Sequence, residues 1–242
     1  MNIYQNILST KKNQEKLLAV LIDPEKVTIE NLSSFFEKVH KSIVTHIFVG
    51  GSTDKNYQTE KVVSAIKKRT HLAVVLFPGS ASQITKKADG ILFLSLLSGR
   101  NPTYLIDQQV LAAPFLKKSS LEILPTGYIL IDGGNITTVQ KVSKTEPITQ
   151  SNVDLIVNTA LAGEYLGKKL IYLEAGSGAT VPVNVKIITQ VKKHLTIPLI
   201  VGGGIRTKKQ IENAYNAGAD IVVVGTAFEK NESFFEELKK KF

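Results

Sequence analysis

The segment from residue 172 to residue 179, Tyr-Leu-Glu-Ala-Gly-Ser-Gly-Ala, carries the strongest chemical signal in the sequence. It places the carboxylate of Glu174 at the end of an apolar stretch, directly before a glycine-rich turn. Glycines allow the main chain to approach a ligand closely, and the helical pattern of residues 185–194 would point its first N–H groups back at that ligand. The segment therefore predicts a site that combines one negative charge with backbone donors, and such a turn suits a phosphate.

Two later turns have the same character. Gly203-Gly204 lies in a run of glycines directly after one apolar run, and Gly225-Thr226 directly follows the next apolar run. In a (β/α) barrel, the loops after the seventh and eighth strands form a recurring phosphate site. We therefore predict that these two turns bind phosphate.

Hard oxygen ligands stand after the first two apolar runs. Asp23 follows the first run, and Ser52 follows a pair of glycines after the second. Carboxylate and hydroxyl oxygens suit Mg²⁺, which keeps several waters and is usually shared with substrate phosphates. The pair predicts Mg²⁺ and a diphosphate substrate. Asp23-Pro24 equally fits a plain turn or a helix cap, and Gly50-Gly51-Ser52 equally fits a tight turn.

Histidine is absent from the residues just after each apolar run. The histidines lie instead at expected helix ends and strand starts: His40, His46, His71 and His194. Catalysis by imidazole and transition-metal sites built on histidine are therefore disfavoured. Glu174, at a strand end among glycines, is the candidate for a ligand contact or a general base.

Short apolar runs alternate with longer segments of helical period, which is typical of a parallel sheet with crossover helices. The expected strands are Leu17–Ile22, Thr45–Val49, Leu72–Phe77, Gly90–Leu94, Gly127–Ile131, Lys169–Glu174, Pro198–Val201 and Asp220–Val224. The expected helices are Ile29–His40, Glu60–Thr70, Gln83–Lys87, Thr103–Leu116, Asp154–Leu166, Val183–His194, Lys208–Gly218 and Ser233–Phe242. Eight strands favour an α/β fold of the closed (β/α)8 TIM-barrel type. The third connection is too short for a regular crossover, so we expect its helix to be reduced or replaced by a loop, and residues 117–126 to form a loop.

Composition limits the class of protein. The 242 residues, 43% of them hydrophobic, suffice for one domain over residues 1–242. The absence of cysteine excludes disulfides and thiolate metal sites and favours the cytoplasm. The first sixteen residues are polar and do not have the apolar core of a signal peptide. No apolar run is long enough to span a membrane. The net charge is +9, but only three basic residues are arginine and the lysines are scattered in pairs. We therefore expect a lysine-rich surface, with no nucleic-acid partner and with attraction to phosphorylated substrates or anionic lipid.

Five segments in this order resemble the geranylgeranylglyceryl phosphate synthase family, which includes the bacterial heptaprenylglyceryl phosphate synthases. They are Leu21–Lys26, Phe48–Ser52, Leu76–Ser80, Tyr172–Ala179 and Val201–Arg206, and the likeness extends from Leu17 to Phe228. The resemblance implies a modified TIM barrel with a reduced third helix. It also implies a Mg²⁺-dependent prenyltransferase that joins sn-glycerol 1-phosphate to a polyprenyl diphosphate, forms an ether and releases diphosphate. A homo-oligomer, either a dimer or a hexamer, is implied as well.

The resemblance also assigns residues to roles. Asp23 and Ser52 resemble the metal-site residues. The glycerol phosphate site is implied for Tyr172, Leu173, Glu174, Ala175, Gly176, Ser177, Gly178, Gly203, Gly204, Gly225 and Thr226. Glu174 would orient the free hydroxyl of the acceptor and take its proton. A groove near strands 2 to 4 and residues 96–104 would hold the prenyl chain, and the pattern of residues 95–114 is more similar to members that use the twenty-carbon geranylgeranyl donor.

Three alternatives stay open at this point. The same reaction with a longer heptaprenyl donor is the first. A barrel isomerase or lyase acting on another phosphorylated metabolite is the second, because it would share the phosphate turns. A non-catalytic phosphate-binding protein is the third, and fold alone does not separate it from an enzyme. Dependence on Mg²⁺ and on an allylic diphosphate distinguishes the second and third alternatives from the prenyltransferase, and the preferred donor decides the first.

Overall fold

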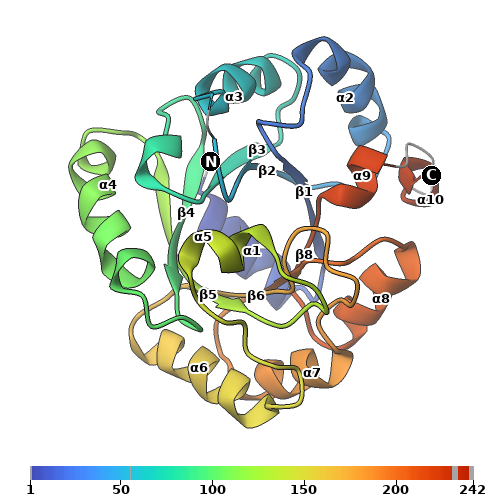
Figure 1. The fold of residues 1–242 in the computed structure, drawn as a ribbon. Coiled ribbons are helices and arrows are strands. Elements are labelled where there is room, and N and C mark those ends of the chain that lie inside the picture. Colours follow the sequence, from blue (N-terminus) through green and yellow to red (C-terminus); the bar gives the residue numbers. More distant parts are fainter. Residues whose placement is uncertain (1, 55, 231–233, 240–242) are drawn as a thin grey trace.

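A closed barrel of eight parallel strands, seen in the computed structural model of the chain, forms the centre of the molecule (Figure 1). The structure describes residues 2–54, 56–230 and 234–239. Each strand pairs with the next along the chain, and β8 closes the barrel on β1. The strands are β1 Leu17–Ile22, β2 His46–Gly51, β3 Ala73–Pro78, β4 Gly90–Leu96, β5 Glu122–Leu130, β6 Leu170–Glu174, β7 Leu199–Gly202 and β8 Ile221–Val224. The predicted fold class is confirmed.

Helices surround the barrel on its outer side, as Figure 1 shows. The helical segments are α1 Ile3–Lys12, η1 Ile29–Asn31, α2 Leu32–His40, α3 Thr59–Lys67, η2 Ala81–Gln83, η3 Thr103–Asp107, α4 Gln108–Lys117, α5 Thr138–Ser143, α6 Val153–Tyr165, α7 Val185–His194, α8 Lys208–Asn216, α9 Thr226–Lys230 and α10 Phe234–Glu237. Of the predicted last helix, residue 233 and residues 240–242 lie outside the described part of the chain. No helix among the described residues has the length and apolar character needed to cross a bilayer.

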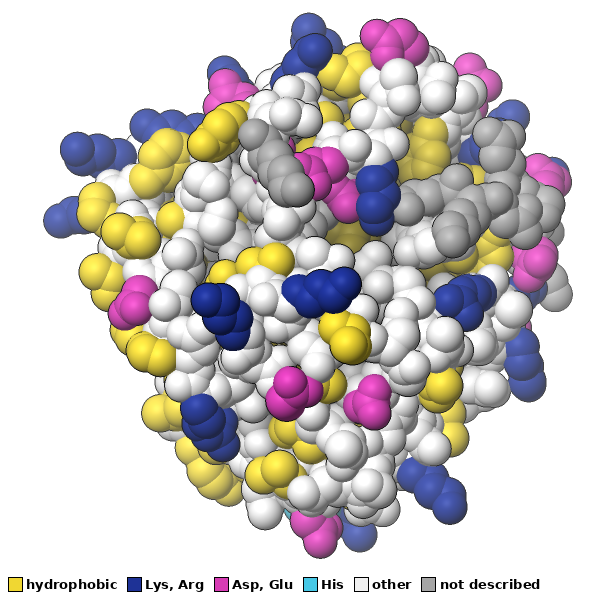
Figure 2. Space-filling view, viewed as in Figure 1, with side chains coloured by type: hydrophobic (Ala, Val, Ile, Leu, Met, Phe, Trp, Pro, Cys, Tyr) yellow, Lys and Arg dark blue, Asp and Glu magenta, His cyan; other side chains and the backbone are white. Residues whose placement is uncertain are grey.

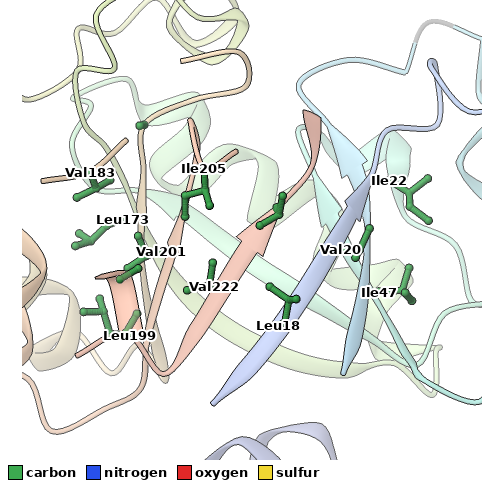
Figure 3. Close-up of a cluster of buried hydrophobic side chains, with 14 of the residues drawn as sticks. Leu18, Val20, Ile22, Ile47, Leu173, Val183, Leu199, Val201, Ile205 and Val222 are labelled. Atoms are coloured by element: carbon green, nitrogen blue, oxygen red, sulfur yellow. The ribbon is translucent and has the colours of Figure 1, made fainter. Parts of the chain in front are cut away.

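Side chains alternate along each strand and so form two apolar layers. In β1, Leu17 and Ala19 face the barrel interior, whereas Leu18 and Val20 pack against the helices. Figure 3 draws part of this outer layer. Because the alternation continues past the strand end, Asp23 follows in the inward register. The same rule decides which residue of each strand end reaches the site.

The third crossover is reduced, as predicted. Between β3 and β4 the chain forms only η2, a single 3₁₀ turn, and the predicted helix at Gln83–Lys87 is absent. Parallel crossovers usually take a dozen or more residues, and residues 79–89 are too few for a full helix that packs back on the sheet. One side of the barrel is therefore left without a covering helix of its own.

The structure corrects the sequence analysis at the first helix, which was not predicted. Helix α1 covers the N-terminal ends of the strands and lies behind the barrel in Figure 1. Ile3 and Ile7 join the inner apolar layer, and the N–H groups of Ile3 and Tyr4 donate to the carboxylate of Glu122. Tyr4 packs partly against the same layer, but the helix is only ten residues long and most of them are polar, so the helical period gave a weak signal.

A second correction concerns the fifth strand. Residues 117–126 were expected to form a loop, but β5 begins at Glu122 and pairs with β4 from its first residue. Pro125 lies inside the strand, where its carbonyl accepts from the N–H of Lys169 at 2.8 Å. Proline argues against a central strand because it lacks a donor, and its presence hid the beginning of β5.

Candidate active site

A cavity with an open volume of about 1050 Å³ lies at the C-terminal mouth of the barrel. The inward register of the strand ends brings most predicted site residues to its wall. These are Asp23, Ser52, Tyr172, Glu174, Gly176, Ser177, Gly178, Gly203, Gly204, Gly225 and Thr226. Residues far apart in the sequence thus meet in one mouth cavity, as expected for strand ends in a barrel.

Two predicted residues have side chains that point away from this cavity. Leu173 lies in the outward register of β6 and, like Ala175, belongs to the outer apolar layer. The N–H of Ala175 donates to the carbonyl of Gly202 at 3.1 Å. Strand alternation explains both cases, because the neighbours of an inward Glu174 must face outward. Leu173 and Ala175 therefore contribute to the site only by fixing the position of the main chain on either side of Glu174.

Glu174 is the only carboxylate on β6 and is almost fully buried, with 6% of its surface exposed. The N–H of Gly176 donates to its Oε1 at 2.7 Å. Burial raises the pKa of Glu174 to about 7, although the adjacent Tyr172 hydroxyl and Gly176 N–H offset part of the rise. A carboxyl group with this pKa changes its protonation near neutral pH, as a general base requires.

Two glycines of the loop after β7 make room for this carboxylate. A Cβ at position 202 would lie 2.5 Å from the Tyr172 hydroxyl and 2.8 Å from Oε2 of Glu174. Gly203 has a φ of +81°, and a Cβ there would lie 2.4 Å from Oε1 of Glu174 and 2.6 Å from the nitrogen of Gly176. Any other residue would collide with the carboxylate and the turn. The two glycine turns and Glu174 therefore fit together as one site.

Asp23 and Ser52, at the ends of β1 and β2, line another wall of the mouth cavity. Oδ1 of Asp23 accepts from the N–H of Glu25 at 3.0 Å, and Nζ of Lys26 lies 3.2 Å from Oδ2. A Cβ at Gly51 would lie 3.3 Å from the Asp23 carboxylate, so this carboxylate stands beside the Gly51-Ser52 segment.

This wall fits a shared Mg²⁺ site and does not fit a metal site made by protein alone. In the described part of the chain, no group of three or more acidic, histidine or cysteine side chains could hold a metal ion. One carboxylate and one hydroxyl suffice for Mg²⁺ when waters and substrate phosphates complete its shell. Asp23 and Ser52 would therefore need phosphate oxygens of the substrate to complete the shell, and binding of Mg²⁺ here stays a prediction.

An aromatic cluster of Phe77, Tyr128 and Tyr172 lines the same cavity. Of these three residues, the sequence predicted only Tyr172 as part of the site. Phe77 is stacked on Tyr172 with 5.4 Å between ring centroids, and Tyr128 contacts Phe77 at 5.9 Å and Tyr172 at 5.5 Å. Within strands these rings resemble ordinary core residues. Their inward register near the strand ends was the available signal.

An apolar groove with an open volume of about 810 Å³ continues from the mouth cavity. Both are lined by Gly51, Ser52, Phe77, Tyr128 and Val139. From there the groove passes between η2 and α4, where Ile84 and Ala112 line it. The groove occupies the side of the barrel on which the crossover between β3 and β4 lacks a full helix. The short η2 leaves that space open.

Helix α5 lies over the mouth and was also missed by the sequence analysis (Figure 1). Thr138 lines the mouth cavity, and Val139 lines both the cavity and the groove. The loop that carries α5 is closed by a bridge between Ile131 and Ile148. Six residues with a single turn of apolar spacing are too short to predict from periodicity.

Comparison with known proteins gives a consistent result. The PcrB family model matches residues 10–242. The geranylgeranylglyceryl phosphate synthase of Zunongwangia profunda is 60% identical over 230 residues, which are 95% of this chain and 98% of that protein. The enzyme of the same name from Flavobacterium johnsoniae is 57% identical over 97% of this chain and 96% of its own length.

A solved structure shows the same fold over nearly the whole chain. It is the (S)-3-O-geranylgeranylglyceryl phosphate synthase of Thermoplasma acidophilum in complex with its substrate sn-glycerol-1-phosphate. The TM-score is 0.91 and the identity 36%, with 98% of this chain and 96% of the other covered.

Proposed function

The chain belongs to the PcrB family, and on that premise we propose that it is a prenyltransferase that makes geranylgeranylglyceryl phosphate from sn-glycerol 1-phosphate. The donor is a polyprenyl diphosphate, and the products are the ether lipid phosphate and diphosphate. The observation that carries the proposal is the meeting of a buried carboxyl of raised pKa, a glycine-lined phosphate site and an apolar groove at one barrel mouth.

The acceptor binds on the side of β6, β7 and β8. Its phosphate is held by main-chain N–H groups of the turns at Gly176–Gly178, Gly203-Gly204 and Gly225-Thr226, which line the cavity together. Arg206, whose guanidinium donates to the carbonyl of Ala179 at 2.7 Å, adds positive charge at the same wall. The phosphate is thereby fixed so that the reacting hydroxyl of the glycerol, the one on C3, reaches Glu174.

Glu174 takes the proton of that hydroxyl as the new bond forms. Its carboxylate is buried and held in place by the Gly176 N–H, so it loses little orientation when the acceptor binds. The C1–O bond of the donor breaks first and its electron pair leaves with the diphosphate, and the hydroxyl oxygen then supplies the electron pair of the new bond to C1. Burial of the carboxyl excludes water from the proton acceptor.

The diphosphate end of the donor lies beside Asp23 and Ser52, which would hold Mg²⁺. When bound, the ion supplies positive charge that stabilises the departing diphosphate. Lys26 stands at the same wall and adds a further positive charge. The metal would thus lie at the ends of β1 and β2 and the acceptor phosphate at the ends of β6 to β8, in one cavity.

The prenyl chain of the donor lies in the apolar groove between η2 and α4. The groove begins at Ser52, next to the diphosphate site, and its far part is lined by Ile84 and Ala112. Relatives from both bacteria and archaea bear the name of the twenty-carbon product. We therefore propose geranylgeranyl diphosphate as the donor, in preference to the heptaprenyl compound.

The direct test is an assay with radiolabelled sn-glycerol 1-phosphate, Mg²⁺ and donors of fifteen, twenty or thirty-five carbons, followed by organic extraction. We expect label in the organic phase, most of all with the twenty-carbon donor. Chelation of the metal and the sn-glycerol 3-phosphate isomer are the controls, and both should abolish or strongly reduce the transfer. Absence of labelled lipid with every donor would favour a barrel isomerase, a lyase or a binding protein.

We also propose that the enzyme acts in the cytoplasm as a homo-oligomer and contacts membranes peripherally. Helix α4 exposes a row of apolar side chains, with Val110 at 62% and Leu111 at 66% exposure, and Figure 2 shows hydrophobic side chains gathered along that edge of the molecule. A patch of this kind marks an interaction site, and a second copy is the occupant that the family resemblance favours.

The net charge of +9 supports attraction to anionic lipid, which co-sedimentation with liposomes at low and high salt would test.

A further inference from the structure

The aromatic cluster stands where the two substrates meet. Phe77 and Tyr128 line both the mouth cavity and the apolar groove, whereas Tyr172 lines only the mouth cavity. Ser52 and Gly51, at the diphosphate end of the donor, are shared in the same way. If the proposed function is accepted, the reacting C1 carbon of the donor lies at this junction.

Phe77 is the most exposed ring of the cluster at the junction. It lies in the inward register of β3, and its side chain is only partly buried, while Tyr128 is 5% exposed and Tyr172 is fully buried. One face of Phe77 is stacked on Tyr172 at an interplanar angle of 24°. Phe77 lines both the mouth cavity and the groove, so the exposed part of its ring borders that open space.

The chemistry at the junction requires such a face. As the C1–O bond breaks, its electron pair leaves with the diphosphate and positive charge spreads over the allylic carbons C1 to C3. The acceptor oxygen then supplies the electron pair of the new bond, and its proton goes to Glu174. Until that bond forms, the cation needs a neighbouring group that stabilises the positive charge but does not itself react with the cation. The face of an aromatic ring does so through its quadrupole.

We propose that Phe77 is a catalytic residue that stabilises the allylic cation, with Tyr128 and Tyr172 as the rings that hold it in place. Phe77 has no hydrogen-bonding group, so it cannot assist the diphosphate or the acceptor phosphate directly. Its contribution is confined to the transition state, where the positive charge exists, and it belongs to kcat. This inference rests on the proposed prenyl transfer.

The test replaces Phe77 by 4-fluoro-, 3,5-difluoro- and 3,4,5-trifluorophenylalanine in the full-length protein. Each fluorine weakens the negative ring face while the size changes little. Rates are measured in a single turnover with geranylgeranyl diphosphate, labelled sn-glycerol 1-phosphate and Mg²⁺. We expect a stepwise fall of about tenfold in rate across the series, with unchanged KM for both substrates. A flat series would overturn the inference.

Two controls separate charge stabilisation from packing. The same fluorinated series at Phe36, which is 2% exposed and lines neither the cavity nor the groove, should leave the rate unchanged. Phe77→Tyr should retain most of the rate because it keeps the ring face, whereas Phe77→Leu should lose at least tenfold in kcat. Equal rates for the Leu and Tyr variants would also overturn the inference. If the unmodified enzyme forms no prenyl product, the proposed function itself fails, which is a different result from a flat series in an active enzyme.

Discussion

The proposed role of Glu174 as a base would make the reaction depend on pH. Its pKa is raised from 4.5 to about 7 mainly by burial, so the folded protein binds its proton more tightly than the unfolded chain does. Proton transfer from the acceptor needs the carboxylate, and therefore kcat/KM should rise with pH and level off above about 7. Replacement of Glu174 by Gln should remove that limb and lower kcat by at least about a hundredfold, as expected for loss of a general base.

The same shift has a consequence for stability. A carboxyl with a raised folded pKa contributes its stabilisation below the unfolded pKa of 4.5 and loses it as the pH rises through about 7. Burying the carboxylate then costs on the order of 3 kcal/mol at pH 8. Glu174→Gln should thus be as stable as the parent at pH 5 and more stable at pH 8, as measured by urea unfolding. A Gln variant of full activity would contradict the role as a base.

A substitution at Gly203 would test whether the close packing of the glycine loop against the Glu174 carboxylate is needed for binding of the acceptor. Gly203→Ala places a Cβ 2.4 Å from Oε1 of Glu174 in a backbone with φ of +81°. We expect the KM for sn-glycerol 1-phosphate to rise at least tenfold and the free energy of unfolding to fall by about 2 kcal/mol. Gly167 is the matched control, because it has the same φ of +81° and nothing within 4 Å of its added Cβ. Gly167→Ala should lose stability only, and an equal rise in KM there would refute the fit.

Helix α4 sets the far wall of the apolar groove. Ala112 is 5% exposed and faces the groove, so a larger side chain would fill the space that the end of a prenyl chain needs. We expect Ala112→Phe to shift donor preference from twenty carbons towards fifteen, by at least tenfold in the ratio of kcat/KM values. Ala113 is exposed on the same helix, and Ala113→Phe should leave the ratio unchanged. Parallel shifts in both variants would argue against the groove.

The strands of the barrel could be predicted because their apolar runs are buried on both sides, which leaves a clear signal in the sequence. Glu174, Asp23 and the glycine turns could be placed because strand ends of a barrel share one mouth. Helix α1 could not, since it is short and mostly polar, and Pro125 concealed the beginning of β5. The aromatic cluster was missed for a different reason: a ring that faces a cavity and a ring that fills a core have the same pattern in a strand.

The exposed apolar row on α4 makes a prediction about assembly. Two copies that pack by this row would bury Val110 and Leu111, and a charge there would remain unpaired in the interface. Light scattering after size exclusion should give a multiple of 26.5 kDa for the parent and a monomer for Leu111→Asp. Val185, 44% exposed at the start of α7, is the matched position, and Val185→Asp should keep the parent mass. A monomeric parent would contradict the assembly.

The reduced third crossover also changes what completes the fold. Where a regular barrel covers its third and fourth strands with a helix, this chain has one turn, η2, and an apolar groove beside it. A prenyl chain bound there, as proposed, would fill that space and act as a temporary part of the hydrophobic core. A non-hydrolysable prenyl thiodiphosphate should then raise the melting temperature more than inorganic diphosphate does at equal saturation, and longer chains should raise it further until the groove is full. The enzyme would be most stable while it holds its donor, and would loosen when the lipid product leaves.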